Sequence, residues 1–206
     1  MQSGRDGGSL YAYYDGYDID EVERRLSGVK HNLPIDVAWA ANRTMRFANR
    51  ELKRAVASRY RITQRDTGKG MKTRSANARN TVAEIRAEGE ALPIKHFTAT
   101  HAKTGVKAAQ LKSNAVTRLE VDGRKAFWAT MKNPKGRDGE ERDYTGVFQR
   151  TSRKRFPIRK IFGSSVPKMI GGETSGVYRE LQPKLAMKLE EYTEKRIRYR
   201  LRMAER

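Results

Sequence analysis

Apolar positions predict a long helix near the start of the chain. From Leu33 onward, small and apolar residues recur three or four positions apart, which places them on one stripe of a helix. Pro34 suits the first helical position and Asp36 suits the first turn. The stripe contains Ala38, Ala41, Met45, Ala48, Leu52 and Ala55. Because the stripe is rich in alanine, we expect another element to pack closely against it.

Residues 81–131 predict a small antiparallel sheet. Apolar and polar residues alternate there with the period of strands. We expect strands at 81–87, 115–121 and 126–131, and a short extended segment at 92–97. Asp122-Gly123 is a strong signal for a two-residue hairpin turn between the last two strands. The long helix should cover the apolar face of this sheet.

Three other stretches lack such a pattern. Residues 63–80 contain Gly-Lys-Gly without the spacing of a phosphate-binding loop, so they predict a flexible basic loop. Residues 132–145 predict a polar loop. In 146–172, apolar residues alternate with basic residues and prolines. That mixture argues against a regular helix or central strand and favours an extended segment.

A second helix is predicted from about residue 176. Its stripe contains Tyr178, Leu181, Leu185, Leu189, Tyr192, Tyr199 and Met203. Arg196 interrupts the stripe, and Pro183 should start or kink the helix. The predicted class is α+β: a long N-terminal helix on a small antiparallel sheet, an extended docking segment and a C-terminal helix. Residues 1–30 should form a flexible or extended arm, and 31–206 a single domain.

The charge of the chain indicates an acidic partner. Among 206 residues, 44 are Lys or Arg and 24 are Asp or Glu, so the net charge is +20. Residues 1–36 carry four basic and seven acidic groups, which leaves the remainder at +23. Several basic stretches in one small chain favour a broad electropositive surface. Ordinary solubilising charge is the alternative.

One row of arginines concentrates this charge on the first predicted helix. Arg43, Arg46, Arg50 and Arg54 fall on the face opposite the apolar stripe. The row could face DNA, an acidic protein or solvent.

Residues for catalysis or metal binding are sparse. The chain has no cysteine, which excludes disulfides and thiol nucleophiles. His96 and His101 are five residues apart, a spacing that fits no helical metal pair. No serine has the sequence context of a hydrolase nucleophile. No apolar run approaches the ~18 residues of a membrane span. We therefore expect no enzyme, no cofactor, no small-molecule substrate and no membrane partner.

The segment from Gly146 to Met169 resembles the minor tail protein Z family of tailed phages. Gly146-Val147-Phe148 matches a GVF element, and 156–169 matches an LPI stretch followed by GPSVPQM. Phe156, Ser164 and Lys168 depart from that pattern. Weaker collinear matches are Leu33-Pro34, Asn42-Arg43-Thr44, Tyr60-Arg61-Ile62 and 92–97. The resemblance covers about 33–170, and residues 1–30 have no counterpart in it.

This resemblance implies a structural virion protein. Such proteins complete the phage tail at its head-proximal end and generally form rings, commonly of six subunits. The implied partners are further copies of the chain, the tail tube, tail terminator or head–tail connector proteins, and phage DNA in the lumen. The implied location is the virion tail, with assembly in the host cytoplasm. The alternative is a basic protein that binds nucleic acid non-specifically on its own.

The mixture of residue types in 146–169 predicts a docking segment. Apolar anchors could enter a neighbour, prolines would limit the entropy lost on docking, and Gly163 would permit a sharp turn. The expected docking residues are Phe148, Phe156, Pro157, Ile158, Ile161, Phe162, Gly163, Val166, Pro167 and Met169, with Arg153, Lys154 and Arg155 around them. Alternatively, the segment packs on its own sheet.

Overall fold

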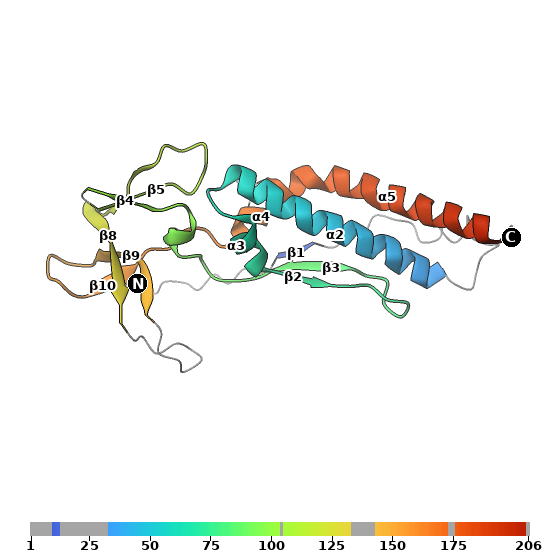
Figure 1. Ribbon diagram of the computed structural model, residues 1–206, viewed down its shortest axis with the longest axis horizontal. Coiled ribbons are helices and arrows are strands. Elements are labelled where there is room, and N and C mark those ends of the chain that lie inside the picture. Colours follow the sequence, from blue (N-terminus) through green and yellow to red (C-terminus); the bar gives the residue numbers. More distant parts are fainter. Residues whose placement is uncertain (1–9, 13–32, 104, 133–142, 173–175, 205–206) are drawn as a thin grey trace.

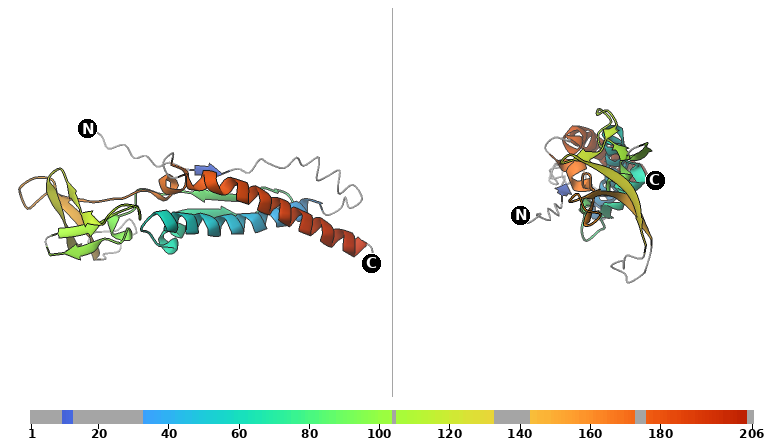
Figure 2. Two further views of the ribbon diagram at one scale, coloured as in Figure 1. Left: turned by 90° about the horizontal axis from the view of Figure 1, so that it is seen from above. Right: turned by 90° about the vertical axis from the view of Figure 1, so that its left-hand side faces the viewer.

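The computed structural model describes residues 10–12, 33–103, 105–132, 143–172 and 176–204. This part of the chain is elongated (Figures 1 and 2). Helices α2 (Leu33–Arg59) and α5 (Val177–Ala204) lie side by side along one half, and a four-stranded sheet occupies the other end. Of the predicted N-terminal arm, only β1 (Leu10–Ala12) lies among the described residues.

The described chain contains both helices and strands, as the α+β prediction requires. The remaining helices are α3 (Gln64–Lys69), the 3₁₀ helix η2 (Ile94–His96) and α4 (Val166–Gly171). The remaining strands are β2 (Met71–Arg74), β3 (Glu84–Ala87), β4 (Thr100–Ala102), β5 (Gly105–Ala108), β6 (Thr117–Arg118), β7 (Glu120–Val121), β8 (Arg124–Met131), β9 (Tyr144–Arg150) and β10 (Ile158–Lys160).

Both predicted long helices are confirmed. Helix α2 buries Met45, Ala48 and Leu52 of the predicted stripe, and it also buries Ala40, Phe47 and Val56. The buried surface is wider than predicted because α2 packs on α5 as well as on β3. Helix α5 begins at Val177 and continues through Pro183. Pro183 therefore does not start this helix.

The strands form three small antiparallel sheets, where the sequence predicted one. Their orders are β1-β3-β2, β10-β9-β8-β7 and β4-β5-β6. Helix α2 packs on a small antiparallel sheet as predicted, but that sheet is the one containing β3. The strands of 115–131 belong to the other two sheets.

The predicted strand 115–121 is divided at Leu119. The Leu119 N–H donates to Val106 O of β5, and its carbonyl accepts from Ala126 N of β8. One residue thus joins two sheets, and β6 and β7 separate there. The Asp122-Gly123 hairpin is confirmed: Val121 pairs with Arg124, and both turn residues have positive φ (54° and 69°).

Residues 63–80 are not the predicted basic loop, because a helix cap organises their first half. Thr63 is the N-cap of α3, and its hydroxyl oxygen accepts from Asp66 N at 3.1 Å. Strand β2 follows directly after Gly70. Residues 92–97 are not simply extended either. They turn through η2, because Leu92 and Ile94 bond the backbone of Gly163 and Ile161 on either side.

Asp66 connects α3 to η2 and supplies a pH-dependent contribution to stability. Lys69 Nζ donates to Asp66 Oδ1 at 2.8 Å, and His96 Nδ1 lies 3.4 Å from Asp66 Oδ2. The bond from Lys69, with those from Thr63 and His96, lowers the pKa of Asp66 from 3.8 to about 2.

Because the pKa of Asp66 is lower in the folded state, its contribution is complete above pH ~4 and is lost as pH falls toward 2. We expect Asp66→Asn to cost about 1 kcal/mol at pH 7, since the groups are partly exposed. Urea unfolding at pH 7 and pH 2.5 checks this. If the free energy of unfolding of the wild-type protein exceeds that of Asp66→Asn by the same amount at both pH values, the prediction is wrong.

Segment 146–172 contains regular elements, contrary to prediction. Strand β9 is an internal strand between β8 and β10, and α4 is a helix. The prolines fit because Pro157 precedes an edge strand and Pro167 lies in the first turn of α4. Ser165 caps α4, its hydroxyl accepting from Lys168 N at 3.4 Å.

Arg196, which interrupts the α5 stripe, forms a buried ion pair with α2. Asp36 is 7% exposed, and its two oxygens accept from Arg196 Nε at 2.6 Å and Arg200 Nε at 2.8 Å. Further along the same seam, Trp39 and Tyr192 pack edge to face with ring centroids 6.4 Å apart. Ion pairs and an aromatic contact thus hold the N-terminal half of α2 to the C-terminal half of α5.

Replacing Asp36 with alanine should leave two adjacent guanidinium groups without their carboxylate. We expect a loss of about 3 kcal/mol of unfolding free energy, as when one partner of a buried pair is removed. Glu194→Ala is the control, because Glu194 and Arg198 form an exposed pair 3.2 Å apart within α5. It should cost under about 1 kcal/mol. Equal urea midpoints for the two variants would refute the structural role of Asp36.

Candidate assembly and polyanion surfaces

The four predicted arginines form one exposed row on α2. Arg43, Arg46, Arg50 and Arg54 are all exposed, and the side chains of Arg50 and Arg54 are 57% and 58% accessible. The row lies beside α5, which adds Lys184 and Lys188 along the seam between the helices. We call Arg43, Arg46, Arg50 and Arg54 the arginine face.

Aromatic rings support this face. The Arg43 guanidinium carbon lies 5.5 Å from the Trp39 ring centroid and 5.4 Å from that of Tyr192. Arg50 lies 5.4 Å from the ring centroid of Phe47. Cations held over rings keep their charge and lose mobility. The guanidinium groups of Arg43 and Arg50 are therefore oriented before any partner arrives.

Among the described residues, Glu51 is the one carboxylate that pairs with the arginine face. Arg54 Nη1 lies 3.1 Å from Glu51 Oε1, and Lys184 Nζ lies 3.0 Å from Glu51 Oε2. The bond from Lys184 and the nearby Arg54 lower the pKa of the Glu51 carboxyl. One negative charge cannot neutralise this row, so the face remains strongly positive.

The structure separates the expected docking residues into two groups. Phe148, Val166 and Met169 are 3%, 2% and 0% exposed, and Pro167 is also buried. The exposure expected of Phe148 is therefore wrong, and all four side chains pack within their own chain, as the alternative interpretation of the segment expected. Ile158, Ile161 and Gly163 are partly buried. The exposed members are Arg153, Lys154, Arg155, Phe156, Pro157 and Phe162.

A second cationic surface was not predicted. On the β9–β10 part of the sheet, Lys160 Nζ and Lys95 Nζ lie 3.8 and 4.3 Å from the Tyr144 ring centroid. Lys160 also lies 5.4 Å from the centroid of Phe162, which is 48% exposed. Lys95 reaches this sheet from η2 by donating to Thr145 O at 2.9 Å. We call Lys95, Tyr144, Lys160 and Phe162 the aromatic–lysine cluster.

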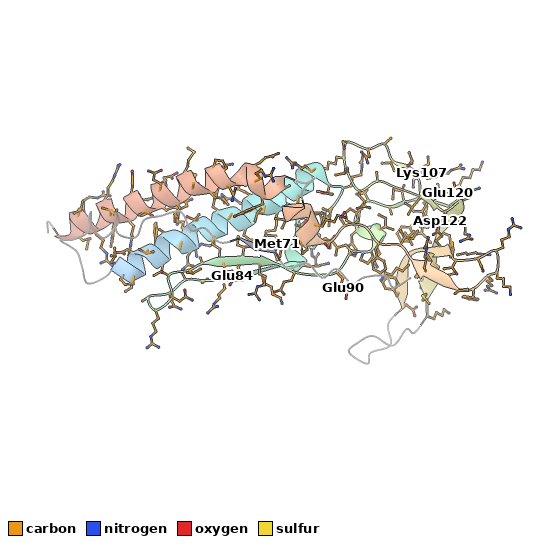
Figure 3. The ribbon with its side chains drawn as sticks, turned by 180° about the vertical axis from the view of Figure 1, so that it is seen from behind. Met71, Glu84, Glu90, Lys107, Glu120 and Asp122 are labelled. Carbon is orange, nitrogen blue, oxygen red and sulfur yellow. The ribbon has the colours of Figure 1, made fainter. Side chains whose placement is uncertain are left out.

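Acidic residues are few around this sheet. The described residues between 92 and 172 include 15 Lys or Arg but only Glu120, Asp122 and Asp143 as carboxylates. Figure 3 shows Glu120 and Asp122 together near one end of the molecule. Asp122 pairs with Arg159 at 3.0 Å, so most of the surrounding basic groups have no carboxylate partner in the described part of the chain.

The family model for prophage minor tail protein Z (GPZ) matches residues 19–206. The chain belongs to this family. The match extends beyond the predicted 33–170 in both directions and includes part of the N-terminal segment and all of α5. The chain is thus a minor tail protein of a prophage. No curated protein and no solved structure matches it.

In this minor tail protein, two glycines of the family-like motif allow aromatic packing. A Cβ at Gly146 would lie 2.6 Å from Tyr144 Cε1, and a Cβ at Gly163 would lie 2.5 Å from Phe97 Cε2. Gly163 therefore provides room for the Phe97 ring; the sharp turn predicted for it is not needed, since its φ is not in the left-handed region.

Groups that could bind a metal ion do not gather in the described part of this minor tail protein. Within the described ranges, no three His, Asp or Glu side chains lie close enough to hold a metal ion. Of the predicted histidines, His96 bonds Asp66 and His101 stacks on Trp128 at 5.1 Å; His31 lies outside the described residues. None of the described helices is long and apolar enough to span a membrane.

Proposed function

We propose that this chain is a structural subunit that completes a phage tail by forming a ring, hexameric, at its head-proximal end. The ring joins the tail tube to the neck proteins, a tail terminator or head–tail connector, and phage DNA passes through its lumen. It needs no cofactor and performs no catalysis. Membership of a minor tail protein family supports the tail location.

The exposed arginine face supports the proposed passage of DNA through the ring. Six copies with a net charge of +20 would carry +120. With a Debye length of ~8 Å at physiological salt, such subunits still repel one another in part, and an anion between them would relieve that repulsion. DNA in the lumen is such an anion, and the arginine face has the exposure and charge to contact its phosphates.

Electron microscopy of the purified protein tests the ring. Closed rings, together with gold label at the head-proximal end of tails when the protein carries an affinity tag, would support the proposal. A protein that stays monomeric at high concentration, with no label on tails, would refute it.

The aromatic–lysine cluster supports a second candidate, a nucleic-acid-binding protein that acts alone. Lysines interleaved with aromatic rings on a sheet surface are typical of single-strand binding. In that case the monomer should bind single-stranded DNA more tightly than duplex, and Lys95→Ala with Lys160→Ala should remove that preference. Equal binding of both DNA forms would exclude the role of the aromatic–lysine cluster, and a monomer that binds neither form would exclude this candidate.

A further inference from the structure

The connection between β9 and β10 exposes three basic side chains and one aromatic ring. Arg153, Lys154, Arg155 and Phe156 are all exposed, and Phe156 is 61% accessible. None of the three basic side chains has a carboxylate partner in the described part of the chain. We call these four residues the cationic tip. Its composition is that of an interface anchor, because an aromatic ring and basic side chains lie together, with Arg155 5.7 Å from the Phe156 ring centroid and with no carboxylate among the described residues to neutralise them.

The outward face of α5 has complementary composition. Met187 is 70% exposed, and Glu190, Glu191 and Glu194 follow at helical spacings that place them beside it. Glu190 has no partner among the described residues, and Glu191 and Glu194 pair with Lys188 and Arg198 of their own helix. We call these four residues the acidic face of α5.

These two surfaces cannot meet within one molecule. The β9–β10 connection projects at one end of the elongated chain, whereas α5 runs toward the opposite end (Figures 1 and 2). The tip and the helix are also packed on separate elements, since β10 pairs with β9 and α5 packs on α2. A contact between them therefore needs two copies of the chain.

We propose that the cationic tip of one subunit docks on the acidic face of α5 in the next subunit. Phe156 contacts the Met187 thioether, one basic side chain of the tip pairs with Glu190, and the other two replace Lys188 and Arg198 at Glu191 and Glu194. Because the two surfaces differ, the contact is head-to-tail, and it closes a ring when the rotation between neighbours returns to the first subunit, as the proposed function requires. The inference rests on the proposed self-association and names the surfaces that produce it.

Charge reversal tests this contact. Like charges should meet at the interface in two variants. One reverses the tip, with Arg153→Glu, Lys154→Glu and Arg155→Glu. The other reverses the α5 face, with Glu190→Lys and Glu194→Lys. Each set should raise the dissociation constant of self-association about a hundredfold or more in nuclease-treated protein. Reversal of Lys103, Lys107 and Lys112, which are exposed elsewhere, is the matched control and should have little effect.

Mixing the two reversed proteins gives the decisive result. In an alternating ring, every tip of one variant meets an oppositely charged α5 face of the other, so a 1:1 mixture should regain rings in sedimentation. Failure of the mixture to assemble, or normal assembly of either variant alone, would overturn the contact. A tip reversal that weakens only DNA binding and leaves DNA-free assembly intact would overturn it too.

Cross-linking gives a separate readout, because the native chain has no cysteine. Phe156→Cys protein mixed with Met187→Cys protein should give a covalent dimer with a short bis-maleimide. The control is Val82→Cys, because Val82 is exposed on another part of the chain. Val82→Cys protein should give no cross-linked dimer with either of the other two variants. If wild-type protein never assembles, the proposed ring is wrong; if it assembles without this cross-link, only the contact is wrong.

Discussion

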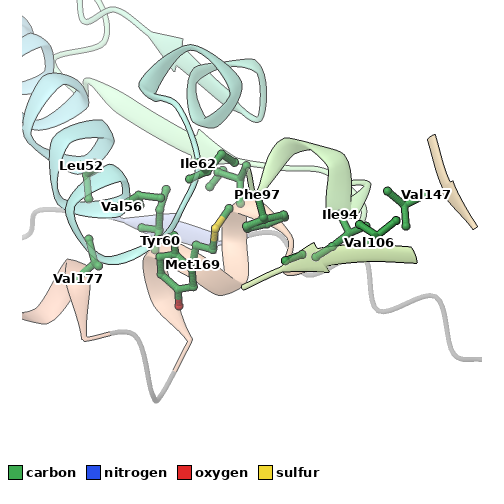
Figure 4. Close-up of a cluster of buried hydrophobic side chains, with 14 of the residues drawn as sticks. Leu52, Val56, Tyr60, Ile62, Ile94, Phe97, Val106, Val147, Met169 and Val177 are labelled. Carbon is green, nitrogen blue, oxygen red and sulfur yellow. The ribbon is translucent and has the colours of Figure 1, made fainter. Parts of the chain in front are cut away.

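Replacing Phe97 with alanine should lower the free energy of unfolding by about 4 kcal/mol. Phe97 is 0% exposed and lies at the centre of the main core, between the end of α2 and the sheets. Figure 4 shows it among Ile62, Met169 and Ile94. Deleting this ring leaves a cavity in the core where α2 and the sheets meet. The stability of the whole described fold should therefore fall.

Phe162→Ala is the matched control for this loss. Phe162 is 48% exposed, so its truncation should cost less than about 1 kcal/mol. Urea unfolding followed by circular dichroism measures both variants. If Phe162→Ala is as damaging as Phe97→Ala, the assignment of one ring to the core and the other to the surface is wrong.

A double-mutant cycle can test whether residue 163 must be glycine because a side chain there would collide with the Phe97 ring. Gly163→Ala alone should cost about 1–3 kcal/mol, because its Cβ would lie 2.5 Å from the ring. In the Phe97→Ala background the added methyl enters the vacated space, so its cost should disappear. Strictly additive losses would show that Gly163 is required for another reason.

The elements that sequence predicted well depend on local information. The periodicity of α2 and α5 extends over many turns, and the Asp122-Gly123 turn is determined by two adjacent residues. The division of the sheets is not local. It depends on Leu119, whose backbone bonds Val106 on one side and Ala126 on the other. No pattern within 115–121 indicates those partners.

The family-like segment was only partly interpretable for a similar reason. Alternating apolar and basic residues indicated exposure, but β9 is covered on both faces, so Val147 and Phe148 are both buried. The sequence pattern of α5 gave no reason for Arg196 on its apolar stripe, because the partner of Arg196, Asp36, is 160 residues away in the chain. The aromatic–lysine cluster likewise brings Lys95 to Thr145, 50 residues along the chain. The arginine row could be predicted because one helix carries all of it.

Reversing the arginine face should stop tail completion while leaving the fold intact. Arg43→Glu, Arg46→Glu, Arg50→Glu and Arg54→Glu reverse four charges, all on exposed residues, and lower the net charge by eight units. If the face contacts DNA, wild-type binding should weaken steeply with salt, and the variant should lose about 0.9 of log–log slope for each phosphate contact removed. Infectivity of complemented phage and DNA affinity across a salt series measure the two effects.

The matched control reverses Lys103, Lys107, Lys112 and Arg118, which are exposed outside the arginine face. This control changes the net charge by the same amount, so it shows what a change in overall charge does by itself. Glutamine at the four arginine positions provides a second control, because it avoids repulsion with Glu51. The arginine face should lose function in both its glutamate and glutamine forms, whereas the control set should not. Unchanged assembly and an unchanged salt slope in the glutamate form would mean that these arginines face only solvent.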